Sequence, residues 1–400
     1  MAVAVERVVK AQQALPRNVR VLGWVSFAND MASELAYPIV PLFLRSVLGA
    51  SFAVVGLIEG IAEGVAVGLR GLAGWLSDRA GERRKPWIVA GYGLTSISRP
   101  LLAAATAWGV VLGARLVDRA GKAARTAPRD ALIRDSTPRP MLGASFGYHR
   151  AMDTAGAVIG PLIAVALLAA GASLRTALWI AVVPGFVTLA LLRAIREAPP
   201  AAREEAMPTG PAHRLPRSFW MVLAVWIIFS LGNSSDVFLI LRAKNLGLGF
   251  TLTVLAYAAY NLVYSGLSWP LGALSDRISR APVLAAGLAV FAVVYVGFAY
   301  APGSWAVWPL FAVYGAYIAA TEGVAKAWVG DRAPAGVAGT AYGIFAGATG
   351  GALLVASITA GLLWSHVSVR APFLLGAAAA AAALVLLIAV EVRAPRDTPA

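Results

Sequence analysis

The chain has 400 residues, of which 59% are hydrophobic and 14% are charged, and its formal net charge is +14. A soluble protein of this size would carry about 25% charged residues, so most of this surface is not built to face water. The chain has no cysteine, which excludes a disulfide framework and a thiolate metal site. Its basic residues are dispersed among short segments between apolar runs, a distribution that favours a membrane protein over a nucleic-acid-binding one.

Apolar stretches long enough to cross a bilayer as helices recur along the whole chain. The first begins near Val21 and continues past Leu42, which is too long for the apolar part of a cleavable signal peptide. We therefore predict an all-α, polytopic membrane protein whose first span is not cleaved. The twelve predicted spans are approximately 20–46, 51–77, 86–106, 107–128, 142–169, 174–196, 218–242, 250–275, 281–301, 303–327, 336–363 and 369–392.

A polar segment, residues 197–217, separates the sixth predicted span from the seventh. It contains Pro199, Pro200 and a run of charged residues, which is typical of a linker. We predict a six-helix bundle over 1–196 and a second over 218–400.

Lys and Arg are distributed unequally between the two sides that these spans define. The positive-inside rule assigns the richer side, the termini and the linker to the cytoplasm of a plasma (inner) membrane. The richer side holds Arg7, Lys10, Arg17, Arg79, Arg83, Arg84, Lys85, Arg129, Arg134, Arg139, Arg203, Arg214, Arg217, Arg277, Arg280, Arg332, Arg393 and Arg396, and the other side mainly Arg45, Arg175, Arg242, Lys244 and Arg370.

A short charged turn occurs twice, about half a chain apart. The first copy reads Gly-Trp-Leu-Ser-Asp-Arg-Ala-Gly over 74–81 and is followed by Arg83, Arg84 and Lys85. The second reads Gly-Ala-Leu-Ser-Asp-Arg-Ile-Ser over 272–279. Such a repeat in a hydrophobic chain indicates two homologous membrane halves.

This turn resembles the loop between helices 2 and 3 of major facilitator superfamily transporters, G-x-L-x-D-R-x-G followed by basic residues. Glu82 and Ser279 depart from that pattern. The resemblance implies two pseudo-symmetric six-helix bundles around a central cavity. It also implies that Asp78 reaches the other bundle, where the N–H groups near Gly336–Thr340 would attract a carboxylate. The residues expected to gate the cavity are Gly74, Asp78, Arg79, Gly81, Asp276 and Arg277.

Two further motifs of that family match in part. In the predicted fourth span, Arg115 and Gly121 fit, but Asp118 and Arg119 stand where Gln and Gly are usual. In the fifth, Gly156, Gly160 and Pro161 fit the motif of proton antiporters, but Ala164 and Val165 replace its final glycines.

Charged side chains are costly at membrane depth and usually line a cavity or form pairs. Several fall roughly 12–18 Å from the start of a predicted span, near the midplane. They are either a structural ion-pair network or a site for substrate and protons. Those at this depth are Asp30, Glu59, Glu63, Arg115 and Arg119. Glu34 and Asp118 belong to the same candidate set, and an alternative places Glu34 and Glu59 near the membrane surface.

The C-terminal half offers fewer charges. Tyr257, Tyr260 and Tyr264 follow helical spacing, which indicates either packing or an aromatic wall for an organic solute with Glu322 as counter-ion. His149, Arg150 and Asp153 follow an Arg- and Asp-rich stretch, and we expect an ordinary hydrogen-bonding role for His149. The candidate substrate- and proton-binding residues of this half are Asn233, Asp236, Tyr260 and Glu322.

The sequence contains no Walker loop, nucleophile elbow or metalloprotease motif, so we expect neither an enzyme nor direct use of ATP. We expect no cofactor and no metal site. The resemblance implies a monomeric secondary transporter of a small-molecule substrate, with proton-coupled efflux by antiport as the leading hypothesis. One alternative is a symporter or uniporter of an anionic solute held by Arg115 and Arg119. Another is a non-transporting membrane receptor or scaffold.

Overall fold

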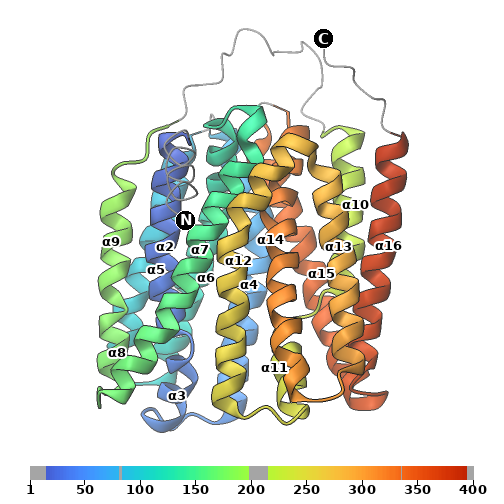
Figure 1. The fold of residues 1–400 in the computed structure, drawn as a ribbon. Helices are drawn as coiled ribbons and strands as arrows, with labels where there is room; N and C mark the ends of the chain where they lie inside the picture. Colours follow the sequence, from blue (N-terminus) through green and yellow to red (C-terminus); the bar gives the residue numbers. More distant parts are fainter. Residues whose placement is uncertain (1–14, 81–82, 198–214, 335, 394–400) are drawn as a thin grey trace, which may run out of the picture.

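The computed structural model describes residues 15–80, 83–197, 215–334 and 336–393, without the side chains of some residues in α4, α12 and α16. Regular structure in these ranges is helical (Figure 1). Within them the helices form twelve segments, because α2 with α3, α8 with α9 and α10 with α11 each make one interrupted segment. The predicted all-α fold is confirmed. The helices are α2 (Arg17–Ala36), α3 (Ile39–Ser46), α4 (Phe52–Arg79), α5 (Arg84–Ala103), α6 (Trp108–Asp135), α7 (Leu142–Ala169), α8 (Leu174–Ile180), α9 (Val182–Leu192), α10 (Arg217–Gly232), α11 (Val237–Asn245), α12 (Phe250–Ile278), α13 (Arg280–Tyr300), α14 (Val307–Arg332), α15 (Ala338–His366) and α16 (Ala371–Arg393).

The outer surface is apolar. Large side chains such as Val293, Val385 and Leu262 are exposed, as expected where lipid replaces water. Within the described residues, six segments are by length and composition apolar enough to cross a membrane. The remaining segments contain more charged residues than these six. The six are Arg139–Ala169, Leu174–Leu192, Arg217–Asn245, Arg280–Tyr300, Ala338–His366 and Ala371–Glu391.

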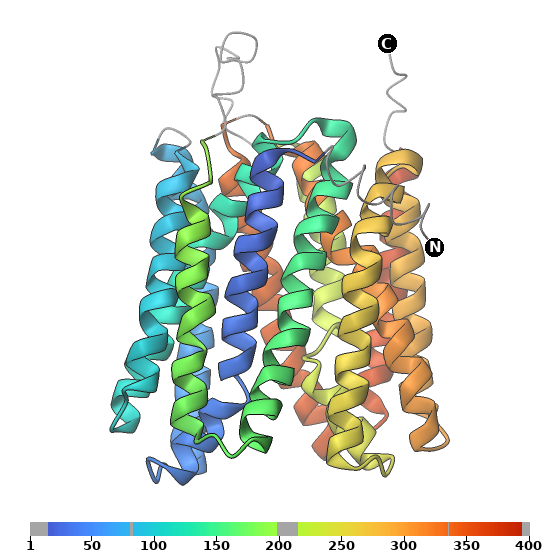
Figure 2. The ribbon, with the colours of Figure 1, turned by 60° about the vertical axis from the view of Figure 1, so that its left-hand side comes forward.

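The segments form two groups. In the first, which we call the N-bundle, α2 packs on α7 and α9, and α6 packs on α4 and α5. In the second, the C-bundle, α14 packs on α12 and α13, and α16 packs on α10 and α13. The bundles meet along two seams, α7 against α12 and α4 against α15, and Figure 2 shows α7 and α12 side by side. The predicted linker 197–217 lies mostly outside the described residues.

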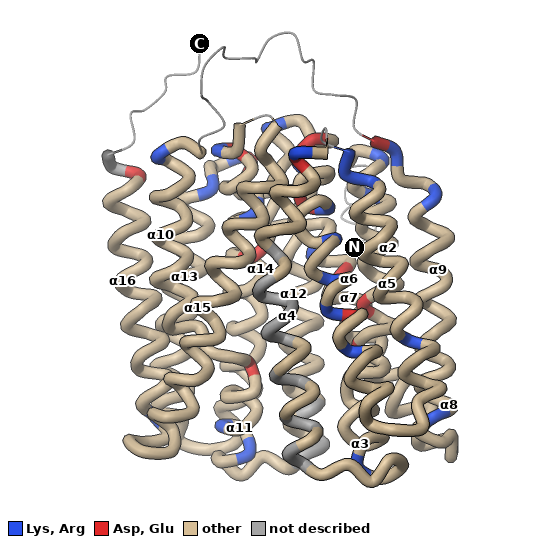
Figure 3. The backbone as a smooth tube through the Cα atoms, turned by 180° about the vertical axis from the view of Figure 1, so that it is seen from behind, with Lys and Arg blue, Asp and Glu red and all other residues tan. Residues whose placement is uncertain are grey.

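One end of the molecule, which we call the terminal face, holds the starts of α2 and α10 and the ends of α9 and α16 (Figure 1). Lys and Arg gather at this end, at the top of Figure 3. Further charges lie deeper, on α6 and α7, at the level of the interior.

The prediction that the fourth span ends near residue 128, with a loop rich in Arg and Asp after it, is wrong. Helix α6 continues to Asp135. Its charges stay within a helix because they are paired: Arg129 lies 3.0 Å from Asp130, and Arg134 lies 3.0 Å from Asp135. Arg134 Nη2 also donates to the carbonyl oxygen of Ala333 in the C-bundle, at 2.7 Å.

Three predicted continuous spans are interrupted. Pro38 lies between α2 and α3, and Pro184 lies one turn after the junction of α8 and α9, where it cannot donate to Ile180. The seventh span breaks over residues 233–236, which contain no proline. There, the Ser235 N–H donates to Ser357 Oγ at 3.1 Å, a side-chain partner that competes with the helical one.

Helices α2 and α7 touch through their backbones at two glycines. A Cβ on Gly156 would overlap the carbonyl oxygen of Phe27. A Cβ on Gly160 would lie 2.6 Å from the carbonyl oxygen of Met31 and 2.7 Å from the nitrogen of Leu35. The small residues therefore set the distance between these two helices.

Replacing Gly160 by alanine should destabilise the protein by about 1–3 kcal/mol, because α2 and α7 must separate to admit the new methyl group. The measurement is the thermal unfolding midpoint of purified protein in detergent. Gly93→Ala is the control, since a Cβ at Gly93 meets open space and should leave stability unchanged or slightly higher. Equal midpoints for the two variants would contradict this packing argument.

Candidate functional site

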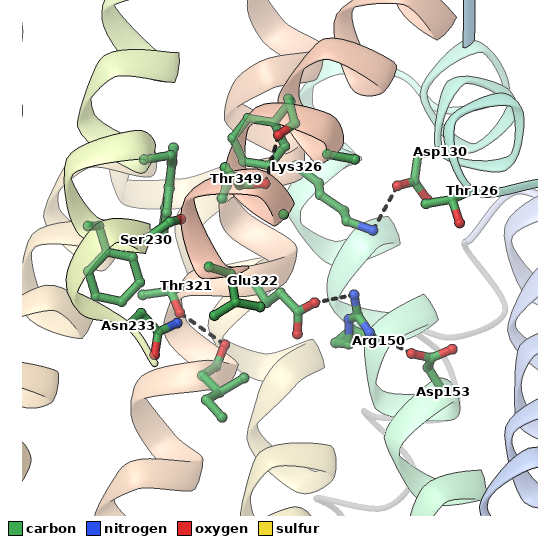
Figure 4. A pocket seen from close by; sticks show the side chains of 18 of the residues that line it. Thr126, Asp130, Arg150, Asp153, Ser230, Asn233, Thr321, Glu322, Lys326 and Thr349 are labelled. Carbon is green, nitrogen blue, oxygen red and sulfur yellow. Dashed lines mark hydrogen bonds and ion pairs between the residues drawn. The ribbon is translucent and has the colours of Figure 1, made fainter. Parts of the chain in front are cut away.

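A cavity of about 600 Å³ lies between the bundles. Its walls come from α2, α6 and α7 on one side and from α10, α14 and α15 on the other. Figure 4 shows charged side chains from both bundles pointing toward one another across it. The charged residues that line it are Asp30, Lys122, Arg125, Arg129, Asp130, Arg150, Asp153, Asp236, Glu322 and Lys326.

Arg150 of α7 joins the two bundles. Its guanidinium forms ion pairs with Asp153 on the same helix and with Glu322 on α14 (Figure 4). The other carboxylate oxygen of Glu322 accepts a hydrogen bond from the Tyr264 hydroxyl, and Asp153 accepts one from Ser26. The Glu322 side chain is 42% exposed, so this shared carboxylate remains accessible from the cavity.

A second ion pair crosses the interface one helical turn along α14. Lys326 Nζ lies 2.7 Å from Asp130 Oδ2 of α6. Asp130 also accepts from Arg129 at 3.0 Å, and its side chain is only 3% exposed. Because an unpaired buried charge is costly, Lys326 depends on Asp130 of the other bundle, whereas Asp130 also has Arg129 on its own helix.

A smaller cavity of about 120 Å³ lies within the N-bundle, between α2, α5 and α6. It brings together five of the predicted residues, and it shares Asp30, Lys122 and Arg125 with the larger cavity. The side chains of Glu59 and Glu63 lie outside the described residues. The predicted residues that line this cavity are Asp30, Glu34, Arg115, Asp118 and Arg119.

In the C-bundle, Asp236 lies in the break between α10 and α11. Its two oxygens accept hydrogen bonds from the hydroxyls of Tyr314, at 2.7 Å, and Tyr260, at 2.8 Å. Asn233 Nδ2 lies 3.3 Å from the hydroxyl of Tyr317. Asn233, Asp236 and Glu322 line the larger cavity, whereas Tyr260 lies behind Asp236.

Seven of the ten charged residues that line the larger cavity were not among the predicted site residues. Asp130 lies beyond the predicted end of the fourth span, although it is part of α6, and Arg125 lies within that span but was not named as a candidate. At a rise of 1.5 Å per residue, Arg150 and Asp153 lie about 12–17 Å from the start of their helix. This is the depth at which Asp30 was selected from the sequence, so the same criterion would have selected both residues. His149 is buried, and its Nε2 has no hydrogen-bond partner among the described residues, so the role expected for it is not seen there.

Asp78, at the end of α4, contacts the start of α15 in the other bundle. It accepts hydrogen bonds from the N–H groups of Gly339, at 3.1 Å, and Thr340, and from the Thr340 hydroxyl. Arg84, whose side chain is 1% exposed, pairs with Asp78 and lies 3.5 Å from Asp135. A helix N-terminus thus meets a carboxylate that a buried arginine holds in place.

The second copy of the turn makes the equivalent contact with the bundles exchanged: the carboxylate comes from the C-bundle and the helix start from the N-bundle. Asp276, near the end of α12, accepts from the N–H groups of Gly143, at 2.8 Å, and Ala144, at 2.7 Å, at the start of α7. Arg280 pairs with Asp276 and lies 3.0 Å from Asp331. We call the two contacts the clamps; both lie at the terminal face.

The other residues expected to gate the cavity differ in their surroundings. A Cβ on Gly74 would overlap the carbonyl oxygen of Gly339, so this glycine allows the bundles to touch. Arg79 is exposed and lies over the Trp75 ring, and Arg277 is exposed, so the buried arginines of the clamps are Arg84 and Arg280 instead. Gly81 lies outside the described residues.

Comparison with known proteins gives consistent results. A family model described as Major Facilitator Superfamily matches residues 22–346 and 236–400. The chain is 36% identical over 382 residues to the uncharacterized MFS-type transporter MJ1317 of Methanocaldococcus jannaschii, covering 94% of this chain and 95% of that one. It is 32% identical to the uncharacterized protein Rv2265 of Mycobacterium tuberculosis, covering 100% of this chain and 98% of that one.

Two solved structures share the fold at low sequence identity. The human organic anion transporter MFSD10 has a TM-score of 0.75 and 14% identity, covering 93% of this chain and 99% of that one. The Escherichia coli fucose:proton symporter FucP has a TM-score of 0.76 and 13% identity, covering 93% of this chain and 98% of that one.

Asp78→Asn should weaken the closure of the terminal face, because the amide lacks the charge that the α15 N-terminus and Arg84 stabilise. A cysteine introduced at Ser230, which lines the cavity, reports the opening. In vesicles that expose the terminal face, a thiol reagent should label this cysteine several-fold more in the Asp78→Asn variant than in the protein with Asp78 unchanged. Asp276→Asn should act alike, whereas Arg79→Gln should not, and unchanged labelling in both aspartate variants would refute the role of the clamps.

Proposed function

The chain belongs to the major facilitator superfamily, and we propose that it moves a small organic solute by alternating access, coupled to protons. The cavity between the bundles supports this proposal, since transporter sites lie near the midplane at the interface of two repeats. We propose that 1–196 and 218–400 move as two bodies joined by 197–217. Each chain has a cavity of its own, and we propose that it acts as a monomer.

The described contacts between the bundles point to one state of such a cycle. Both clamps lie at the terminal face, and a Cβ on Gly147 of α7 would overlap the carbonyl oxygen of Ser268 on α12. The ion pairs of Arg150 and Lys326 lie below them. These contacts support a state closed at the terminal face, and we propose that the cavity then opens toward the other side.

The observation that carries proton coupling is the shared carboxylate of Glu322. It faces the cavity and pairs with Arg150 of the other bundle. A proton on Glu322 would remove its charge and weaken this link, so protonation would shift the balance between conformations, and conformation would shift protonation equally. Asp30, which lines both cavities, is the second candidate, and Glu34, Glu59 and Glu63 remain candidates from the sequence.

We propose antiport, and therefore efflux driven by inward proton flow, as the direction of coupling. A carboxylate that has taken up a proton no longer attracts a cationic group, so a proton and a cationic group of the solute would compete at a carboxylate of the cavity, for which Asp30, Asp236 and Glu322 are the candidates. Such competition is what exchange requires.

Symport or uniport of an anionic solute is the second candidate. The smaller cavity favours it, because five cations line it against three carboxylates. One structure of similar fold is an organic anion transporter and another is a fucose:proton symporter. The five cations are Arg99, Arg115, Arg119, Lys122 and Arg125, and the carboxylates are Asp30, Glu34 and Asp118.

Neutralising the coupling carboxylate should abolish accumulation driven by a pH gradient but spare counterflow exchange, which needs no net proton movement. We would find a transported solute by a thermal-shift screen and compare Glu322→Gln and Asp30→Asn in proteoliposomes. Glu391→Gln is the control, since this carboxylate lies at the terminal face, 3.5 Å from Arg332. Wild-type accumulation by both cavity variants would exclude these two residues as proton carriers.

We propose that the terminal face is cytoplasmic in a plasma (inner) membrane, from the excess of Lys and Arg on it (Figure 3). Because the chain has no cysteine, single cysteines can be introduced at Ala80, on the terminal face, and at Thr106, on the other side. Both positions are exposed. An impermeant thiol reagent on intact cells should label the protein at Thr106→Cys but not at Ala80→Cys; the reverse pattern would invert the orientation.

A further inference from the structure

Most charges of the larger cavity are matched by an opposite charge, but some are not. Arg150 pairs with Asp153 and Glu322, and Lys326 pairs with Asp130. A few charged groups are instead surrounded by neutral partners only. Among the described residues, they are Arg125 and Asp30 in the N-bundle, the latter accepting from Asn29 at 3.0 Å, and Asp236 in the C-bundle.

Arg125 is one of two cationic residues, with Lys122, that line both cavities. Its Nη1 donates to Thr95 Oγ1 at 2.6 Å, and its guanidinium lies 4.3 Å from the centre of the Tyr92 ring. The side chain is 4% exposed, and its Nε has no hydrogen-bond partner. Within the described residues, no carboxylate lies within ion-pair distance of it.

Arg99 extends this positive wall behind the smaller cavity. Its Nη2 donates to the backbone and side-chain oxygens of Asn29, at 2.9 and 2.8 Å, and to Ser33 Oγ at 3.0 Å. These acceptors are neutral, and Nη1 has no partner. Among the described residues, neither Arg99 nor Arg125 forms a direct ion pair, although Asp30 and Asp118 line the same smaller cavity.

Asp236 is the opposite case in the C-bundle. Its described partners are the hydroxyls of Tyr260 and Tyr314, and no cation among the described residues pairs with it. Asn233 Oδ1, on the same broken segment, is buried without a partner and could accept a further hydrogen bond. The rings of Trp226 and Phe229 line the same wall, and aromatic faces attract cations.

Buried charges without counter-charges are costly, and the cost falls when a ligand supplies the opposite charge. We propose that the transported solute is a zwitterionic organic molecule. Its anionic group binds at Arg125, and its cationic group binds at Asp236 and Asn233. This rests on the proposed function, and the cavity of about 600 Å³ is of the size that holds a small organic ligand.

Binding at both ends would also connect the solute to the conformational cycle. A solute held by α6 of the N-bundle and by the break between α10 and α11 of the C-bundle interacts more strongly when the bundles approach each other. Such a difference in interaction between states is what allows a ligand to shift a conformational equilibrium.

The test uses charge-matched probes in thermal shift on the purified full chain at pH 7. Phenylalanine, tryptophan and glycylphenylalanine are each compared with the methyl ester (cationic), the N-acetyl form (anionic) and the N-acetyl methyl ester (neutral). For at least one skeleton, the zwitterion should bind about tenfold or more tightly than each of its other forms, as expected for loss of a charge-assisted contact. Arg125→Gln should remove the preference for the free carboxylate, and Asp236→Asn the preference for the free amine.

Arg79→Gln, on the exposed surface, is the matched control and should keep both preferences. If Asp236→Asn does not fold, Asn233→Leu removes the neighbouring acceptor and should weaken binding of the zwitterion but not of its N-acetyl form. A singly charged or neutral form as the tightest ligand, no stabilisation by any probe, or unchanged preferences in the cavity variants would overturn the proposal. Failure of the proposed proton coupling is a separate outcome: the zwitterion would still bind, but its accumulation would not depend on a pH gradient.

Discussion

The cost of an isolated charge in a space with little water organises the centre of this molecule. Arg150 and Lys326 each lie at the bundle interface with a carboxylate from the opposite bundle. Such pairs are strong when closed and costly when one partner is left behind. The two bundles are therefore joined by ion pairs, and under the proposed function protonation or a bound solute would alter the strength of these pairs. This would give the cavity control over the distance between the bundles.

The clamps at the terminal face apply a different principle. Asp78 and Asp276 each bind the first N–H groups of a helix in the other bundle, and Arg84 and Arg280 hold these carboxylates in position. Each bundle supplies one carboxylate and one helix start. Closure therefore requires both halves to be in register at the same time, which favours a cooperative movement over gradual opening.

Much of the fold was predictable because lipid imposes long apolar segments, and the repeated turn revealed the two halves. The family resemblance implied that Asp78 reaches the other bundle, and electrostatics favoured the N–H groups at the start of α15 as its partner. The length of α6 was not predictable from hydropathy, since Arg129, Asp130 and Arg134 look like a loop until their partners are known. Likewise, the break at residues 233–236 depends on Ser357, a partner distant in the sequence. Which charges lack an opposite charge, as Arg125 and Asp236 do, is a property of the assembled cavity alone.

Beside the side chains of the clamps, the seams include close contacts of main chain with main chain at glycines. A Cβ on Gly74 would overlap Gly339, and a Cβ on Gly143 would overlap Gly272. Surfaces without side chains have no rotamers to order when they meet and none to release when they part. The bundles can thus associate and separate repeatedly with little loss of conformational entropy. The same feature makes the seam intolerant of mutation, because any larger residue at these four positions would act as a wedge that holds the terminal face open.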